Sequence, residues 1–295
     1  MDELTGDRGL IEVESLPFWT GPIKIWPLED GLTNRNYGVQ QADGQRFAVR
    51  LGQDKPEHGV MRFNEQAAAK AAARAGISPK IFFTAPGVIV SRLLPGGSLK
   101  PGEVQHPENL LRIVALARRC HTAMASFLQG PLLAFWVFHV NRSYAAGLRK
   151  AGSRLDDDLS WLMEVNDKLE QRAAKVDITF CHNGLLAENV FDDGARLWLL
   201  GWDHAGFNAP LFDLANLSSS NGFFPNDDET LLRSYYDAAP DRAVYDAFQT
   251  FKCAALLREL LGSATMEQSL DVSLDKVGQT DDCMARLETA LAALN

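Results

Sequence analysis

Polar side chains with the chemistry of a metal–phosphate site gather in one stretch of the chain, from Phe180 to Asn216. A short apolar run ends at His182, and Asn189 follows it. Two aspartates and a glycine between short apolar runs then predict a hairpin that leads to Asp203, and Asp213 stands where a helix is expected to begin. Carboxylates and an amide at the two ends of a hairpin can converge on one metal ion bound to phosphates.

The same stretch closely resembles the catalytic segment of choline/ethanolamine kinases and of their aminoglycoside-phosphotransferase relatives. In that family the segment runs His-Asn-Asp-Leu, four variable residues to Asn, a hairpin to Ile-Asp-Trp/Phe-Glu, and on to Asp-Leu-Ala-Asn. The resemblance extends from about Trp26 to about Gly262. It implies a bilobal α+β fold of the protein-kinase-like type, with a small antiparallel β-sheet lobe carrying one helix and a larger, mainly α-helical lobe.

The resemblance also implies site residues and ligands. It places His182 in the catalytic loop, makes Asp213 a support for that loop, and makes Asn189 and Asp203 ligands of Mg²⁺. ATP and Mg²⁺ are the cofactors it implies, and the hydroxyl of a small amino alcohol is the implied phosphate acceptor.

Two positions depart from the family pattern. Gly184 stands where the family has its catalytic-loop aspartate, and Gly201 where it has its principal magnesium aspartate. The first aspartate orients the substrate hydroxyl and takes its proton, and the second holds the metal that bridges the phosphates. Glycine has no side-chain oxygen for either task. Loss of a positioned general base alone typically costs roughly 10²–10⁴-fold in rate.

Three hypotheses follow from these departures. The chain is a pseudokinase that keeps the fold and some nucleotide binding, or a working small-alcohol kinase that uses Asn189 and Asp203 in an unusual way. The third is an ordinary kinase inactivated by substitution, since the residues around the two glycines still match an active pattern. The first and third both predict a dead site on an intact fold.

The N-terminal part reads as strands from Ile23 onward, joined by turns rich in glycine and polar residues. The first turn contains Gly31, Thr33 and Asn34, and it fits a plain hairpin as well as a loop that covers nucleotide phosphates. Its Gly-Leu-Thr-Asn sequence resembles the corresponding loop of choline kinases, which implies contact with the nucleotide.

Arg50 closes the third predicted strand, and Glu65 lies on the alanine-rich helix predicted over Met61–Ala75. In kinase-like folds a basic residue on this strand contacts the nucleotide phosphates and pairs with a glutamate on the following helix. Without the resemblance, an unrelated surface arginine and glutamate would explain the pattern as well.

Two further strands are predicted over Lys80–Thr84 and Gly87–Leu93, and a Pro-Gly-Gly sequence then breaks the pattern. If a nucleotide lies in the cleft, backbone groups from Ser91 to Leu94, Leu93 among them, face its adenine. The predicted organisation is a lead-in over 1–22 with a helical turn near 10–16, a nucleotide-covering lobe over 23–94 and a helical lobe over 95–295.

Beyond Lys100 the pattern is helical, and the family's late helix, usually Arg-Glu followed closely by tryptophan, resembles Leu257–Gly262. That tryptophan would face a quaternary ammonium through cation–π attraction, and Leu261 stands near its place. Trp202, Phe207 and Tyr235 could line an alcohol pocket instead, although tryptophans are more often core. His121 is read as a packed or surface histidine. Helices are predicted over Glu108–Phe127, Val140–Gly152, Asp156–Ala174, Glu229–Ala238, Arg242–Leu261 and Asp281–Leu294.

Composition is that of an ordinary globular protein, with 46% hydrophobic and 23% charged residues. A formal net charge of −9 argues against nucleic acid or an anionic membrane as the main partner, while leaving room for a local basic site. Four cysteines without paired spacing suggest free thiols, and no apolar run reaches membrane length. A cytoplasmic location is therefore expected.

Overall fold

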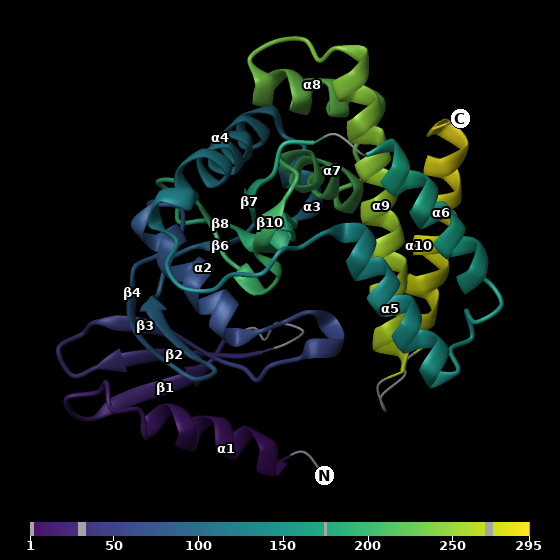
Figure 1. Cartoon of the computed structure of the whole chain (residues 1–295). Helices are drawn as coiled ribbons and strands as arrows, with labels where there is room; N and C mark the ends of the chain where they lie inside the picture. The colour runs from purple at the N-terminus through teal and green to yellow at the C-terminus, as the bar shows by residue number, and fades with distance from the viewer. Residues whose placement is uncertain (1–2, 29–33, 174–175, 269–273, 295) are drawn as a thin grey trace.

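A five-stranded antiparallel sheet forms the smaller lobe of the computed structural model, which describes residues 3–28, 34–173, 176–268 and 274–294 (Figure 1). The strands lie in the order β1-β2-β3-β5-β4. They span Ile23–Pro27 (β1), Arg35–Gln41 (β2), Arg46–Leu51 (β3), Ile81–Ala85 (β4) and Val88–Arg92 (β5). The strands predicted from Ile23 onward, and those predicted over Lys80–Thr84 and Gly87–Leu93, are all present.

The two faces of β3 have different roles. Phe47, Val49 and Leu51 are buried and point to one side, because side chains alternate along a strand. Arg50 therefore points to the opposite side. Helix α1 (Glu3–Glu14) supplies Val13 to the same apolar cluster as Phe47, so the lead-in forms a full helix where a single turn was predicted.

Helix α2 (Arg62–Arg74) joins the sheet to the rest of the molecule. Its buried alanines allow close packing, and Gly76 just beyond it adopts the left-handed conformation (φ 69°) that commonly follows a helix end. The buried amide of Asn64 donates to the carbonyl of Ala205 at 2.7 Å and accepts from the backbone N–H of Leu133 at 2.9 Å. One side chain thus hydrogen-bonds two distant segments of the larger lobe.

The predicted hairpin of the central stretch is present as β8 (Val190–Asp192) and β9 (Leu197–Leu199), with Gly194 at φ 86° in its turn. The short strands β7 (Thr179–Cys181) and β10 (Gly206–Asn208) pair with each other. A two-residue strand β6 (Gly97–Ser98) beside β8 and a short helix α3 (Pro101–Val104) were not predicted. Single-turn 3-10 helices lie at Pro56–His58 (η1), Met124–Phe127 (η2), Ala187–Asn189 (η3) and Trp202–His204 (η4).

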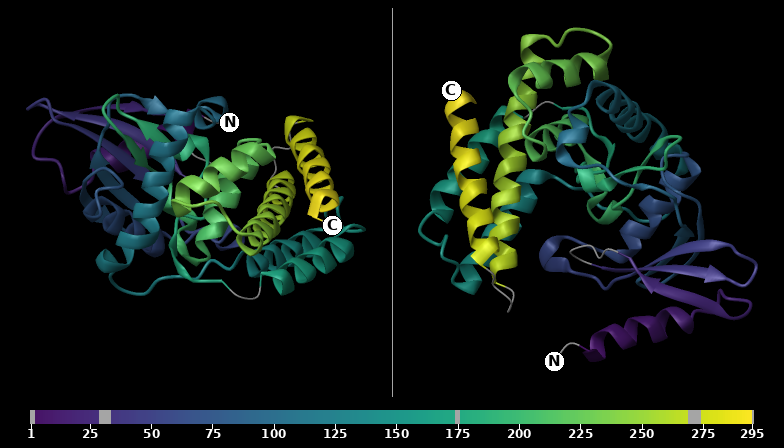
Figure 2. Two further views of the ribbon diagram at one scale, coloured as in Figure 1. Left: turned by 90° about the horizontal axis from the view of Figure 1, so that it is seen from above. Right: turned by 180° about the vertical axis from the view of Figure 1, so that it is seen from behind.

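The larger lobe is built around α9 (Arg242–Glu267), which packs against α5 (Val137–Ala151), α6 (Leu159–Arg172), α7 (Pro210–Ser220) and α10 (Leu274–Leu294). Figure 2 shows α9 and α10 side by side on the flank away from the sheet. Helices α4 (Pro107–Ala123) and α8 (Pro225–Tyr236) complete the lobe. The predicted helices are present, but their ends differ from the predicted ones. Helix α10 begins before the predicted Asp281, and α9 continues beyond the predicted Leu261. No helix within the described residues is both long and apolar enough to span a membrane.

Phe251 of α9 is fully buried among the rings of Trp136, Phe138 and Phe212, at centroid distances of 6.1–6.4 Å. We predict that Phe251→Ala lowers the free energy of unfolding by about 3–5 kcal/mol, because it removes a buried ring and leaves a cavity. Urea denaturation measures the loss. Phe224→Ala, at a side chain that is 72% exposed, is the matched control and should stay within about 0.5 kcal/mol. Equal effects of the two changes would contradict this account of the core.

Candidate active site

Four charged side chains form an ion-pair network where the two lobes meet. Nε of Arg50 on β3 lies 2.7 Å from a carboxylate oxygen of Glu65 on α2, so the predicted pair is in contact. Nη2 of Arg50 also pairs with Oδ2 of Asp203 in η4. Nη1 of Arg62, at the start of α2, lies 2.6 Å from Glu65 and 2.8 Å from Oδ1 of Asp203. Two guanidinium groups therefore hold two carboxylates between the lobes.

Arg62 was missed by sequence reasoning. It is 6% exposed, and its Nε donates to the carbonyl of Gln53 at 2.9 Å while its backbone N–H donates to Asp54 at 2.7 Å. Its position three residues before Glu65 on a helix was an available signal, because side chains at that spacing are neighbours. That spacing does not reveal the contact with Asp203, which lies 141 residues away in sequence.

Both oxygens of Asp203 are bound to arginines, whereas the family resemblance had implied a metal ligand. Burial by itself raises the pKa of this carboxyl, but the charge and hydrogen bond of Arg50 outweigh it and hold the pKa well below its usual range. Asp203 is therefore a carboxylate at neutral pH, and its charge is neutralised within the protein.

The segment from His182 to Gly201 brings the other expected residues together. His182 is buried, with its Nε2 2.8 Å from the carbonyl oxygen of Leu200 and its ring 4.6 Å from that of Trp202. The amide of Asn189 donates to the carbonyl of Gly184 at 2.8 Å. A Cβ on Gly201 would lie 2.2 Å from Oδ1 of Asn189. The loop, the amide and both glycines thus share one small region.

The two glycines differ in what surrounds them. A Cβ on Gly184 would have its nearest neighbours, atoms of His182 and Asn189, at 3.8–4.0 Å, which is ordinary contact. Gly201 has φ 74°, in the left-handed region that favours glycine, and a side chain there must displace the amide of Asn189. Position 184 has room for an aspartate, and position 201 has room only after Asn189 moves.

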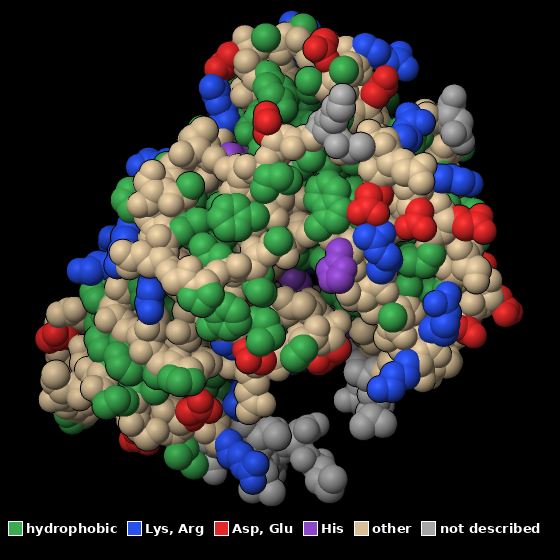
Figure 3. Space-filling view, viewed as in Figure 1, with side chains coloured by type: hydrophobic (Ala, Val, Ile, Leu, Met, Phe, Trp, Pro, Cys, Tyr) green, Lys and Arg blue, Asp and Glu red, His purple; other side chains and the backbone are tan. Residues whose placement is uncertain are grey.

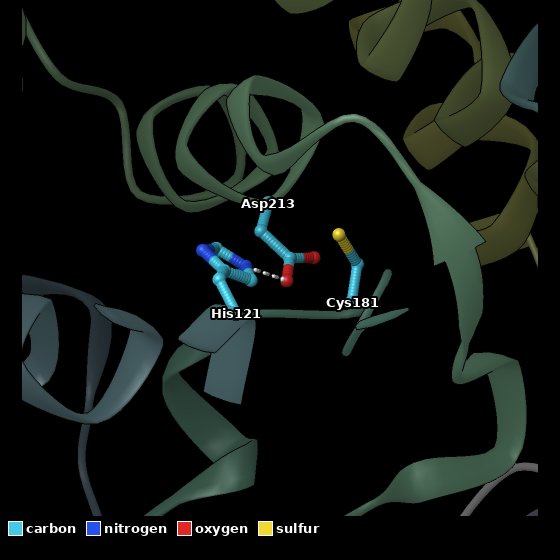
Figure 4. A group of neighbouring side chains, drawn as sticks. All are labelled: His121, Cys181 and Asp213. Carbon is cyan, nitrogen blue, oxygen red and sulfur yellow. Dashed lines mark hydrogen bonds and ion pairs between the residues drawn. The ribbon is translucent and has the colours of Figure 1, made fainter. Parts of the chain in front are cut away.

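Asp213, in the first turn of α7, is fully buried and accepts the hydrogen bonds expected of it. The backbone N–H of His182 donates to Oδ2 at 2.8 Å, and that of Asn183 to Oδ1 at 2.6 Å. Nε2 of His121 lies 2.8 Å from Oδ2 (Figure 4). Its Nδ1 lies 2.8 Å from the hydroxyl of Tyr235. Asn183 has φ 61°, a costly conformation for a residue other than glycine. These bonds fix the strained turn of the loop.

His121, Cys181 and Asp213 present ligand atoms within 4.8 Å of one another, which raises the question of a metal (Figure 4). The donors are already in use, because Asp213 accepts from two backbone N–H groups and the thiol of Cys181 lies 3.4 Å from the carbonyl of Asn208. Burial raises the pKa of Cys181 well above its usual value, so the thiol stays protonated. The group is a hydrogen-bonded support for the loop.

On the nucleotide side, Gly31 and Thr33 lie outside the described residues. Asn34 stands directly before β2. Ser91 lies inside β5, in register with Ala48 of β3 and Ile81 of β4. Leu93 follows β5, and its N–H donates to the carbonyl of Arg46 at 3.4 Å. The adenine contacts of this segment remain a prediction.

The side chains considered for an alcohol pocket, and Leu261 near the place of the family's tryptophan, have defined neighbours in the structure. Trp202 is buried and donates to the hydroxyl of Ser78 at 2.7 Å, Tyr235 contacts His121, and Leu261 is fully buried in the helical core. Phe207 is 37% exposed on β10 and packs edge-on against Phe180. Trp202, Tyr235 and Leu261 have apolar neighbours or hydrogen-bond partners that come from tertiary packing, which the linear pattern does not show.

Replacement of Asp213 tests the support of the loop. Burial raises its pKa, but the hydrogen bond and charge of His121 and the loop N–H groups outweigh it and lower the pKa overall. A depressed folded-state pKa adds stability above the unfolded-state value, near 4, and that stability is lost as the pH falls through the folded-state value. We predict that Asp213→Asn costs about 3 kcal/mol at pH 7, and that the difference from the unaltered chain narrows below about pH 4.

Urea denaturation of both proteins between pH 7 and pH 3 checks this prediction. Asp246→Asn is the control, because its carboxylate makes an exposed pair with Arg242 one helical turn away and should change stability by less than about 0.5 kcal/mol. A gap between Asp213→Asn and the unaltered chain that stays constant over the whole pH range would overturn the assignment.

The chain is similar to proteins of known family. A family model described as choline/ethanolamine kinase matches residues 25–248. Ethanolamine kinase 2 of Mus musculus is 27% identical over 233 residues, which cover 73% of this chain and 58% of that protein. Protein LicA of Haemophilus influenzae is 25% identical over 210 residues, covering 70% of this chain and 60% of the relative. The chain thus matches rather less than two thirds of the length of these relatives.

Solved structures show the same fold. Choline kinase LicA from Streptococcus pneumoniae superposes with a TM-score of 0.77 at 20% identity, covering 97% of this chain and 99% of that one. A choline/ethanolamine kinase family protein from Mesorhizobium loti gives 0.74 at 25% identity, with 98% of both chains covered. A thermostable mutant of aminoglycoside phosphotransferase APH(4)-Ia gives 0.66 at 15% identity, with 97% of both covered. The bilobal, protein-kinase-like fold is therefore present, and with a family model matching most of its length the chain belongs to the choline/ethanolamine kinase family.

Proposed function

We propose that this chain binds an adenine nucleotide and a small alcohol in the cleft between its lobes, and that its phosphotransfer activity is impaired or absent. Nucleotide binding is supported by the Arg50–Glu65 pair at the cleft and by complexes of structural neighbours, LicA with AMP and the APH(4)-Ia mutant with AMP-PNP and hygromycin B. The small alcohol follows the substrate named for ethanolamine kinase 2.

The engagement of Asp203 carries the proposal of impaired chemistry. Gly184 and Gly201 offer no side-chain oxygen, so a working kinase would depend on Asp203 and Asn189. Asp203 is held by both Arg50 and Arg62, and its release would leave two half-buried or buried guanidinium groups short of a carboxylate. Removing one partner from a buried ion pair is strongly destabilising, by about 3–5 kcal/mol. This cost weighs against the alternative of an active kinase that uses Asn189 and Asp203.

The residues at hand do not fit a magnesium site. Mg²⁺ requires near-octahedral oxygen ligands and in proteins is bound through one or two carboxylates together with substrate phosphates. Asn189 can offer Oδ1, since its nitrogen donates to the carbonyl of Gly184. Asp203, the carboxylate that the resemblance assigns to the metal, is paired with Arg50 and Arg62. The Mg²⁺ implied by the family therefore lacks a carboxylate ligand here, and no step is assigned to it.

The first test compares ATP binding with and without Mg²⁺. We predict that the ion raises ATP affinity by less than about 3-fold in the unaltered chain, because no free carboxylate draws the metal–nucleotide complex into the cleft. Isothermal titration calorimetry measures both affinities. The Gly201→Asp variant is the matched control and should show a larger gain, since it returns the missing carboxylate. A gain above about 10-fold in the unaltered chain would contradict the proposal.

The second test restores both carboxylates. We predict that Gly184→Asp leaves stability within about 0.5 kcal/mol, whereas Gly201→Asp costs about 1–2 kcal/mol because of its left-handed backbone and the displaced amide of Asn189. Only the double variant should gain phosphotransfer, by at least roughly 10²-fold, because base and metal ligand act as a unit. Turnover of ATP with a panel of small alcohols measures the gain. Equal turnover in the unaltered and double-variant proteins would show that another residue performs the chemistry.

A further inference from the structure

Five side chains from segments far apart in sequence converge beside η4, and we call them the Arg258 cluster: Arg258, Phe135, His204, His58 and Tyr144. The guanidinium carbon of Arg258 on α9 lies 5.2 Å from the ring centre of Phe135, which in turn lies 5.9 Å from the ring of His204. The rings of His58 in η1 and Tyr144 on α5 are 6.3 Å apart.

Helix α9 joins the two groups of this cluster, Arg258 with Phe135 and His204 on one side and His58 with Tyr144 on the other. A Cβ on Gly262, one helical turn beyond Arg258, would lie 4.0 Å from Cζ of Tyr144. The charge of Arg258 also acts on both Tyr144 and His204. Figure 3, which labels no single residue, shows histidine side chains among hydrophobic ones near the middle of this face. Arg258, His58 and His204 are half-buried, so the cluster is partly exposed to solvent.

Arg258 lacks a counter-charge. Within the described part of the chain, no carboxylate forms an ion pair with its guanidinium, although Arg50, Arg62, Arg154 and Arg286 all have such partners. Its neighbour Glu259 pairs instead with Arg286. Burial lowers the pKa of Arg258 and outweighs the nearby charges of Glu259 and Asp213, neither of which forms an ion pair with it.

The histidines of the cluster add hydrogen-bonding groups without adding charge. Burial, and then the charge of Arg258, lowers the pKa of His204 to about 3, so its imidazole is neutral at pH 7. Its Nδ1 is buried and has no hydrogen-bond partner in the structure. Burial also lowers the pKa of His58 and raises that of the Tyr144 hydroxyl, so both stay neutral. A cation without an ion-pair partner and an imidazole nitrogen without a hydrogen-bond partner thus belong to one cluster, on either side of Phe135.

This arrangement suits an anion better than a cation. Arg258 would repel a quaternary ammonium group, and the ring of Phe135 that could attract one is already occupied by the guanidinium. Leu261, near the place of the family's aromatic residue, is fully buried. A carboxylate would gain charge-assisted hydrogen bonds from the planar guanidinium. His204 directly follows Asp203 in η4, so the cluster adjoins the ion-pair network at the cleft.

We propose that the Arg258 cluster binds the carboxylate of a small hydroxy acid, with the guanidinium of Arg258 as its ion-pair partner and Nδ1–H of His204 as a further donor. This inference rests on the proposed function, which has a small alcohol bind in the cleft. It adds that this alcohol carries a carboxylate, so that the ligand is a hydroxy acid and not a simple amino alcohol. Arg258 is then the residue that selects the ligand.

Matched ligands that differ only in a carboxylate test the proposal. Serine is compared with ethanolamine, and homoserine with 3-aminopropanol, by calorimetry on the full chain. We expect each acid to bind at least about 10-fold more tightly than its partner, the effect of one charge-assisted pair. Arg258→Gln should reduce the preference to within about 2-fold, and Arg258→Lys should retain part of it. Arg118→Gln, which removes an exposed arginine of α4, is the control and should leave the preference unchanged.

A second pair of variants covers the case in which Arg258→Gln fails to fold. His204→Leu removes the Nδ1 donor and should weaken binding of the acids by several-fold, whereas His204→Asn places an amide near the position of Nδ1 and should restore it. Equal binding of acids and amines by the unaltered chain overturns the proposal. So does a variant pair in which Leu and Asn at position 204 behave alike.

Titration with ATP separates this inference from the proposed function and from a phosphate ligand. If ATP binds but the acids show no preference, this inference alone is wrong. If the acids bind in an Arg258-dependent way and ATP does not bind, the proposed function is wrong and the carboxylate site stands. If Arg258→Gln weakens ATP by about 10-fold and leaves the preference for acids unchanged, Arg258 serves the nucleotide phosphates and the carboxylate site is overturned.

Discussion

The ion-pair network of Arg50, Glu65, Arg62 and Asp203 is the constraint on which the geometry of the cleft depends. Arg50 belongs to the sheet, Arg62 and Glu65 to α2, and Asp203 to the segment that follows the hairpin of the larger lobe. Each carboxylate contacts both guanidinium groups, so the charges balance. Buried ions are costly to desolvate, and only close geometry with complete pairing offsets that cost. The two lobes must therefore keep their relative position for the network to stay satisfied.

Other polar contacts support the same junction. The amide of Asn64 hydrogen-bonds the backbone at Ala205 and Leu133, and the indole of Trp202 donates to Ser78 just beyond α2. On the far side of the loop, Asp213 accepts backbone N–H groups and is oriented by His121. Asp203 and Asp213 are thus engaged in holding structure, and Gly184 and Gly201 offer no side-chain oxygen.

The charge balance of the cleft follows from this arrangement. Among the described residues of the network and the Arg258 cluster, there are three guanidinium groups, those of Arg50, Arg62 and Arg258, and two carboxylates, those of Glu65 and Asp203, which pair with Arg50 and Arg62. The histidines nearby are neutral because burial lowers the pKa of each. A protein with a net charge of −9 therefore has a local excess of positive charge where its ligands are proposed to bind. Such local excess depends on placement and not on composition.

The sequence alone determined the family, the strand pattern of the small lobe and the hairpin of the catalytic segment. These features depend on local chemistry: alternation along β3 sets which way Arg50 points, and an Asp-Asp-Gly turn sets the hairpin. The missing oxygens at Gly184 and Gly201 were also readable, since a glycine has no side chain in any fold. The pairing of Arg50 with Glu65 was predictable from the resemblance.

Only the tertiary structure decided how the remaining charges are used. Arg62 meets Asp203 across 141 residues of sequence, so the carboxylate that was expected to bind a metal is also an ion-pair partner. Packing alone decides that Trp202 and Leu261 are buried, and that the hydroxyl of Tyr235 lies beside Nδ1 of His121. The isolation of Arg258 was equally invisible, because the absence of a counter-charge is a property of everything packed around a residue. Long-range packing sets burial, and burial decides whether a charged side chain needs a partner.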